Sequence, residues 1–516
     1  MFKQKNWKST GFLFLLMVLA VLRADARPGD GKPLDGVHPA YTIEQARPDN
    51  FKPQVGALAF LPNGKLVLTG FKPSQTGDLN PDYTGTLYII DNPTEQDPEK
   101  ISVRAISNEL HEPLGANVVE GVLYICDRNE ISKWTDTDGD GVPDKKQTLA
   151  SGWVSDNFHH FTFGLPYDGK HFYVTFSTNV TFKHMIKAEN MKGMDVIHNG
   201  PNPKYRGSLL KIDVETGAYS EVAGGLRTPN GVSLGPDGVI LCPDNQGAWK
   251  PASGIYTAKQ GAFYGYYNNT KATSDFYPDG GVPSAFSDQP ITPPAVWVPQ
   301  NECANSPGEM IQIPDGHPHA GQYLMAEINL NGLRRVFFEK VGDTWQGAIF
   351  RHSQGFEAGT HRLEWGPDGC LYVGCIGGRG TWAWKNTTFG LQRIRPTGKA
   401  AFEFDKIQAT RDGFRLSYTK PVDRAVLENL ASYSIHAWTY KHTAEYGGPK
   451  IPKDKKQQVV GIKHAIPSED GISVELILDQ DRKPNHVYHI RSDIRSTSGE
   501  KMWSPEGWFT FHTSPK

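Results

Sequence analysis

A short phrase recurs along this chain of 516 residues and constrains its fold more than any other feature. Each copy is an apolar run, a turn built from Gly, Pro, Asn or Asp, and a second apolar run, which together predict a β-hairpin. One hairpin cannot bury both of its apolar faces, whereas hairpins arranged radially as blades can. The six copies start about 45–80 residues apart, at Val55, Gly115, Phe161, Thr228, Gly308 and His361.

These copies predict an all-β chain in which residues 27–401 form a six-bladed β-propeller. An open array of β-sandwiches is the alternative that the spacing leaves. In the last part of the chain the repeated phrase gives way to short alternating strands, as at 433–440 and 487–492. Such strands predict an Ig-like β-sandwich over residues 402–516.

The first 26 residues have the pattern of a cleaved signal peptide. Three lysines precede an apolar run of 12 residues (11–22), which Ala24-Asp25-Ala26 follows as a small-x-small cleavage pattern. The run is short for a membrane span, and no later stretch reaches about 18 apolar residues. We therefore expect a signal peptide over residues 1–26, no membrane span in the mature protein, and a secreted or periplasmic location.

The charge and cysteine content exclude two classes of protein. Lys and Arg number 54 against 56 Asp and Glu, a net charge of −2, whereas a nucleic-acid binder needs a concentrated excess of basic residues. Five scattered cysteines are too few for a disulfide scaffold. With 54 Gly and 37 Pro, the chain has the turn residues that many short strands require.

The fourth copy carries the clearest resemblance to a known family. GLRTPNGVSLGPDG from Gly225, DNQG from Asp244 and LQRIRP from Leu391 resemble glucose/sorbosone dehydrogenase-like six-bladed propellers. Similar chains are secreted proteins of environmental bacteria described as membrane-bound dehydrogenases, and the C-terminal part is similar to bacterial Ig-like domains. Thr228 stands where the family has Asn, and Asn230 where it has Gln.

The resemblance implies an exported oxidoreductase that acts on a carbohydrate or polyol in an axial funnel. It implies pyrroloquinoline quinone (PQQ) and calcium as cofactors, and an external electron acceptor such as a cytochrome c. Arg227 matches the family's quinone-contacting arginine, and Gly247 matches a carbonyl that binds calcium.

One loop has the spacing of a calcium site. DTDGDGVPD offers oxygens at alternate positions, and Gly141 is placed to make the turn, although Gln147 replaces the bidentate Glu of an EF-hand. A solvated acidic turn is the alternative. The predicted Ca²⁺ ligands are Asp136, Asp138, Asp140, Val142 and Asp144.

Polar residues precede the innermost strand in several copies, where a propeller gathers side chains around its axis. His159 or His160 is the predicted base, because neutral imidazole can accept a proton from a sugar hydroxyl. Arg227 and Arg362 would polarise an oxygen. Burial between blades is the alternative for each of these residues. The predicted substrate contacts are Asn230, Asn305, Glu357, His361 and Trp382.

Two other functions suit the same scaffold. One is a lyase or a lactonase-like hydrolase that acts without a redox cofactor. The other is a non-catalytic glycan-binding propeller. The residues alone do not choose among the three.

Overall fold

The computed structural model describes residues 36–71, 84–182, 196–197, 202–267, 283–378, 387–443 and 445–516. The predicted signal peptide and Trp382 lie outside these residues. Within the described part of the chain, no helix is both long and apolar enough to cross a membrane.

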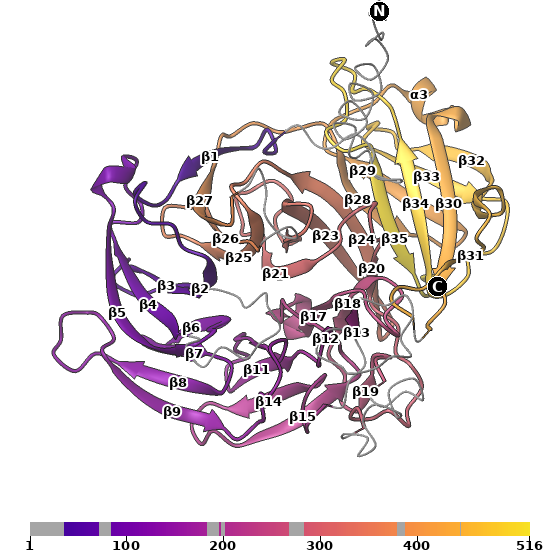
Figure 1. The fold of residues 1–516 in the computed structure, drawn as a ribbon. Helices are drawn as coiled ribbons and strands as arrows, with labels where there is room; N and C mark the ends of the chain where they lie inside the picture. The colour runs from indigo at the N-terminus through magenta and orange to yellow at the C-terminus, as the bar shows by residue number, and fades with distance from the viewer. Residues whose placement is uncertain are drawn as a thin grey trace, which may run out of the picture.

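Six antiparallel sheets surround one axis and form the blades of a propeller (Figure 1). The first blade contains β2 (Val55–Phe60), β3 (Leu66–Gly70), β4 (Thr84–Asp91) and β5 (Ser102–His111). The second contains β6 (Gly115–Val119), β7 (Val122–Cys126), β8 (Glu130–Thr135) and β9 (Lys145–Ser151). The third contains β10 (Thr162–Phe163), β11 (His171–Phe176), β14 (Leu209–Asp213), β15 (Tyr219–Gly224) and, parallel to β15, β19 (Ala262–Phe263).

The fourth blade contains β16 (Ser233–Leu234), β17 (Ile240–Asp244), β18 (Ser253–Thr257) and β20 (Val296–Val298). The fifth contains β21 (Pro307–Gln312), β22 (Tyr323–Glu327), β23 (Gly332–Val341) and β24 (Thr344–Ser353). A short pair, β12 (Thr181–Phe182) and β13 (Val196–Ile197), stands apart from the blades. Each of the six sequence copies forms the inner two strands of one blade, so the prediction of a six-bladed propeller is confirmed.

The ring is closed by the two ends of the propeller sequence. The sixth blade contains β25 (Gly359–Trp365), β26 (Leu371–Ile376) and β27 (Phe389–Pro396), and its outer strand is β1 (Tyr41–Gln45), which precedes the first blade in sequence. Because β1 pairs with β27 in antiparallel register, the sixth blade joins both ends of the ring. Such closure leaves only short, protected strand edges.

Apolar side chains from neighbouring blades form the core. Leu66 and Leu68 of the first blade pack with Tyr372 of the sixth, and Val67 packs with Trp134 of the second. Burying such side chains contributes about 1.5–3 kcal/mol each. Blade-to-blade packing therefore stabilises strands that no single hairpin could stabilise.

Two further sheets form a β-sandwich after the propeller. One contains β28 (Phe404–Ala409), β29 (Gly413–Tyr418), β33 (Ser473–Leu478) and β32 (Ile462–Pro467). The other contains β35 (Glu506–Phe511), β34 (His486–Ser492), β30 (Tyr433–Tyr440) and β31 (Lys450–Ile451), and the short helix α3 (Arg424–Glu428) precedes β30. Leu416 and Val474 of one sheet share a core with Ile435 and Phe509 of the other. The boundary at residue 402 and the Ig-like assignment stay predictions.

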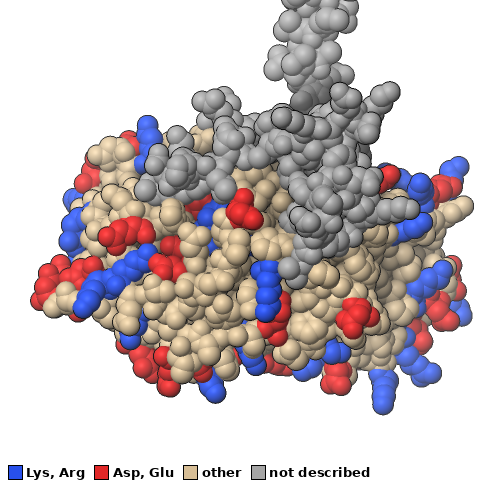
Figure 2. All heavy atoms as spheres, turned by 60° about the horizontal axis from the view of Figure 1, so that its bottom comes forward, with Lys and Arg blue, Asp and Glu red and all other residues tan. Residues whose placement is uncertain are grey.

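The sandwich shares a sheet with the propeller. β24, the outer strand of the fifth blade, pairs with β35 from Gly347↔Thr510 to Phe350↔Gly507, so eight strands form one continuous sheet (Figure 1). The sequence predicted two separate units because its pattern does not show which strand edges meet. On the face drawn in Figure 2, basic and acidic side chains are interspersed over a mostly uncharged surface.

Candidate functional site

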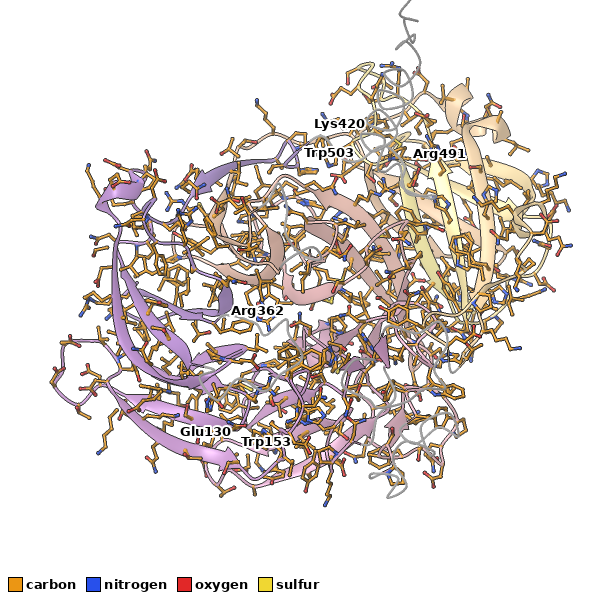
Figure 3. All side chains as sticks on the ribbon, viewed as in Figure 1. Glu130, Trp153, Arg362, Lys420, Arg491 and Trp503 are labelled. Atoms are coloured by element: carbon orange, nitrogen blue, oxygen red, sulfur yellow. The ribbon has the colours of Figure 1, made fainter. Side chains whose placement is uncertain are left out.

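Arg362 on β25 lies near the centre of the ring (Figure 3) and binds three other blades. Its Nε donates to Gly56 O of the first blade at 2.7 Å, and its Nη2 donates to Leu114 O, just before the second blade, at 3.0 Å. Nη1 donates to Asn230 O, before the fourth blade, at 3.2 Å. Only 2% of this residue is exposed. Arg362 therefore satisfies backbone carbonyls that would otherwise be buried without donors.

His361 and Asn230 belong to the same axial network. Asn230 Oδ1 accepts from Arg362 Nη2 at 3.1 Å and lies 3.1 Å from His361 Nε2. The other ring nitrogen of His361 is 2.8 Å from Val55 O, and burial, then Arg362, holds the pKa of His361 well below its usual value. The structure thus brings three predicted residues together in hydrogen bonds across the axis. The predicted part of Arg362 in catalysis, and of His361 and Asn230 as substrate contacts, stays a prediction.

Two partly buried acids beside this network were not predicted from the sequence. Glu309 on β21 accepts a hydrogen bond from Leu363 N at 2.8 Å, and burial raises its pKa although Arg362 opposes the shift. Burial and then Glu309 raise the pKa of Glu364 to about 8. The only sequence signal was a charged residue inside an apolar hairpin copy.

Arg227 lies elsewhere, in the loop that enters the fourth blade. Asp244, at the end of β17, accepts from the backbone N–H of Arg227 at 3.0 Å and of Thr228 at 2.7 Å. Lys250 Nζ lies 3.1 Å from Asp244 Oδ2, and both residues are fully buried. This ion pair fixes the Arg227 loop. Lys250 was not predicted from the sequence, because a single lysine in a loop gives no sign of a buried acidic partner.

Glu327, at the corresponding point of the fifth blade, holds a loop in the same way as Asp244. Glu327 ends β22 and accepts from the backbone N–H of Asn305 at 3.0 Å and of Ser306 at 2.7 Å. Asp244 and Glu327 both end the second apolar run of their sequence copies. That recurrence is the signal that could have identified them as residues that order the loops before β16 and β21.

His159 is the predicted base that the structure places near Arg227. Its Nδ1 lies 2.7 Å from Thr178 O, so Nδ1–H donates to that carbonyl and Nε2 keeps its lone pair. Burial, then the charge of Arg227, lowers the pKa of His159 to about 3. The side chain is therefore a neutral acceptor beside a cation, an arrangement suited to a hydroxyl group.

His160 has different surroundings. It is completely buried, and its Nδ1 lies 3.1 Å from Asp156 Oδ1. Burial lowers its pKa to about 4, although Asp156 opposes the shift, and the charge of Arg206 adds to the lowering. The structure therefore separates the two predicted bases and leaves only His159 beside Arg227.

The remaining predicted contacts lie in separate loops. Glu357 accepts from Arg47 at 2.5 Å and from Gln45 at 3.0 Å, which attaches it to the ring closure. Asn305 accepts from Asn301 N at 2.6 Å within its own loop. The predicted single funnel site is thus divided among the axis, the fifth and sixth blades, and the entry to the fourth blade. The physical reason is that buried backbone groups near the axis need polar partners of their own.

The calcium position that the resemblance places at Gly247 does not fit this chain. The Gly247 carbonyl accepts hydrogen bonds from Gly447 N at 3.0 Å and from Lys250 N at 3.2 Å, so both of its lone pairs are engaged. The segment that follows, WKPASGI from Trp249, contains no acidic residue that could supply a further calcium ligand.

The quinone fits the residues around Arg227 better. Arg227, which the resemblance matches to the quinone-contacting arginine, shares the neighbour Thr178 with His159, which was predicted as a base from its place before an inner strand. Thr228 Oγ1 and Trp249 Nε1 are buried there without a hydrogen-bond partner among the described residues. Both atoms can donate hydrogen bonds to ligand oxygens. Arg227, Thr228 and Trp249 are the residues that would hold the quinone.

The predicted calcium loop is exposed between β8 and β9. Carboxylate oxygens of Asp136, Asp138 and Asp140 lie within 4.8 Å of one another. Asp136 accepts from the N–H of Gly141, the main cause of its lowered pKa. Asp144 instead accepts from Thr137, and Val142 is buried. Three of the five predicted ligands converge, and calcium binding stays a prediction.

A second cluster joins the sixth-blade closure to the sandwich. Glu403 Oε1 lies 2.5 Å from His38 Nε2 and 3.0 Å from His319 Nε2. Ala40 N–H donates to His38 Nδ1, so His38 carries its proton on Nε2 and donates it to Glu403. A metal ion on Nε2 would need that lone pair, and this cluster is therefore a hydrogen-bonded ion network.

Comparisons with known proteins add fold likeness only. No protein-family profile and no curated protein matches the chain. The PQQ-bound aldose sugar dehydrogenase of Streptomyces coelicolor is similar at 12% identity and a TM-score of 0.45, over 69% of this chain and 99% of that one. The holo form of the pyranose dehydrogenase PQQ domain of Coprinopsis cinerea is similar at 12% identity and a TM-score of 0.43, over 71% of this chain and 99% of that one.

A calcium structure of a family AA12 carbohydrate-active enzyme of Trichoderma reesei has 12% identity and a TM-score of 0.42, over 71% of this chain and 100% of that one. At these values the likeness carries no argument about activity. The fold rests on the strand pairing described above.

Proposed function

We propose that this protein is an exported oxidoreductase that acts on a carbohydrate or polyol, with PQQ as its redox cofactor. The observation that carries the proposal is that His159 and Arg227 share one neighbour at the entry to the third and fourth blades. Thr178 O lies 2.7 Å from His159 Nδ1, and Thr178 N donates to Arg227 O at 2.8 Å. The charge of Arg227 also helps to lower the pKa of His159, which keeps the imidazole neutral.

His159 and Arg227 have complementary parts in this mechanism. Thr178 O holds Nδ1–H of His159, so Nε2 is directed as the acceptor for a substrate hydroxyl proton. Arg227 stabilises the negative charge that develops on the oxygen as that proton moves. The negative charge on that oxygen also stabilises the protonated form of His159, and it therefore raises the pKa of His159 during the reaction. When bound, PQQ supplies a quinone that accepts the two electrons.

Other parts of the proposal concern the surroundings of the reaction. Ca²⁺ in the 136–144 loop would rigidify the outer hairpin of the second blade, where Asn63 already donates to Gly141 O at 2.7 Å. A cytochrome c or similar carrier would take the electrons from the reduced cofactor. The signal peptide would deliver the protein to the periplasm or the exterior.

Reconstitution tests the proposal. The protein is titrated with PQQ in the presence of Ca²⁺, and binding is followed by quenching of tryptophan fluorescence. The loaded protein is then supplied with a dye acceptor and a panel of sugars and polyols. We expect saturable quinone binding and dye reduction with at least one substrate. Absence of both would overturn the proposal, and turnover without any acceptor would instead indicate a lyase or hydrolase.

A non-catalytic glycan-binding protein is the second candidate. It is favoured by the engaged carbonyl of Gly247, which leaves the family's calcium position without a free ligand. Alanine at both His159 and His160 separates the two functions. Glycan binding that survives these substitutions, with no turnover by the native protein, would support this candidate.

A further inference from the structure

The sandwich reaches the Arg227 site through one loop. Residues 441–443 and 445–448, here called the seam loop, lie between β30 and β31 and contact the propeller loop that follows β17. Gly447 N donates to Gly247 O at 3.0 Å, and Trp249 N donates to Thr443 O at 2.7 Å. Ala248 and Tyr446 form an antiparallel bridge. Backbone pairing on this scale fixes the seam loop against the propeller.

Arg227 is held between the two loops. A Cβ atom at Gly247 would lie 2.2 Å from Arg227 Cδ, so only glycine leaves room for the arginine against this backbone. The Tyr446 ring centroid lies 5.6 Å from Arg227 Cζ, within cation–π range. Tyr446 is nevertheless 54% exposed. The sandwich therefore presents a half-exposed aromatic ring directly beside the proposed site.

One polar group of the seam loop suits a neutral, hydroxyl-rich ligand. Thr443 Oγ1 is buried without a hydrogen-bond partner among the described residues. A threonine hydroxyl both donates and accepts hydrogen bonds. A sugar hydroxyl can supply either partner, and the exposed face of an aromatic ring packs against the apolar face of a sugar.

We propose that the seam loop is a wall of the carbohydrate site and that Tyr446 determines specificity by stacking on a sugar ring. The ligand class is a neutral oligosaccharide, with one unit at Arg227 and the next against Tyr446. This inference rests on the proposed function for the identity of the first subsite. The sandwich is then part of the binding site and more than a spacer.

The wall can be tested without any sugar or cofactor. Phenylglyoxal modifies exposed guanidinium groups, and mass spectrometry of the Arg227 peptide gives the rate of modification. We expect Tyr446→Ala to raise that rate at least threefold, with the Arg395 peptide as an internal reference. Ile466→Ala, which removes an exposed side chain from the distant strand β32, is the matched control. An unchanged rate of Arg227 modification in Tyr446→Ala would contradict the proposal that the seam loop covers Arg227.

The ligand class is tested by calorimetry with cellohexaose, maltohexaose, xylohexaose and mannohexaose, on the protein without quinone. We expect at least one to bind, Tyr446→Ala to weaken that binding about tenfold, and Tyr446→Phe and Ile466→Ala to stay within twofold. Binding of none, or equal binding by Tyr446→Ala, would overturn the inference. Monosaccharide oxidation by the quinone-loaded native protein and by loaded Ile466→Ala needs only the first subsite, and it therefore reports separately on the proposed function.

Discussion

Replacing Arg362 by methionine is the sharpest test of how the propeller axis is held together. The substitution keeps a long apolar stem and removes the guanidinium, whose five hydrogen bonds go to three backbone carbonyls of other segments, the Asn230 side chain and its neighbour His361. The carbonyls of Gly56 and Leu114 would lose their bonds to this donor in a site closed to water.

The magnitude follows from two opposing effects. Each hydrogen bond to a charged donor contributes about 1.5–3 kcal/mol, but the arginine also loses its hydration, as the lowering of its pKa to about 10 by burial indicates. Removing one partner from such a buried network costs about 3–5 kcal/mol in net terms. We therefore expect Arg362→Met to lower the free energy of unfolding by that amount.

Urea unfolding followed by tryptophan fluorescence measures the loss, with the slope against urea compared between variants. Arg395→Met is the matched control, because Arg395 lies on the same blade but pairs with Glu44 at a partly exposed position. The control should lose no more than about 1 kcal/mol. Equal losses in the two variants would refute the structural role assigned to Arg362.

Three further predictions concern other charged groups. Lys250→Met leaves Asp244 buried without its cation and should lower the free energy of unfolding, measured in urea, by about 3–5 kcal/mol. The double variant Asp244→Asn, Lys250→Met should recover part of that stability, and a double variant no more stable than Lys250→Met would contradict the prediction. Burial raises the pKa of Glu403, but the charge and hydrogen bond of His319 outweigh it, so its pKa lies well below the usual value. The stabilisation from ionised Glu403 is therefore present above about pH 4.5 and lost as pH falls further. Glu403→Gln should make the free energy of unfolding depend less on pH below about 4.5. An unchanged pH dependence would be evidence against the network of Glu403 with His38 and His319. Removing Ca²⁺ with EGTA should lower the melting temperature by about 2–4 °C, a shift that Asp138→Asn should abolish; equal shifts in both proteins would place the ion elsewhere.

The strands were predictable because their signal is local. Apolar runs around turns such as Pro62-Asn63-Gly64 specify a hairpin wherever they occur, and the strand expected at 433–440 has those bounds in the structure. Ring closure by β1 and the pairing of β24 with β35 were not predictable. They depend on which strand edges meet after folding, and edge residues carry no unique partner code.

The sequence predicted which residues could belong to a site, but not which of them lie next to one another. Arg227 and Arg362 occupy comparable places in their sequence copies, yet one lies beside His159 and the other binds carbonyls across the axis. In the sequence, Arg227 and Arg362 give the same signal, an arginine close to the start of an inner strand. Only the three-dimensional distance between blades decides whether its donors meet a ligand or the backbone, and the seam loop contacts depend on that geometry as well.

Dye reduction by the quinone-loaded protein, compared between His159→Gln and His160→Gln on the best substrate of the panel, tests the central claim most directly. The account predicts that His159→Gln lowers kcat by about 10²–10⁴-fold, while folded His160→Gln stays within a few-fold of the native protein. Loss of activity only in His160→Gln, or in neither variant, would contradict the assignment of His159 and Arg227 as the reacting pair.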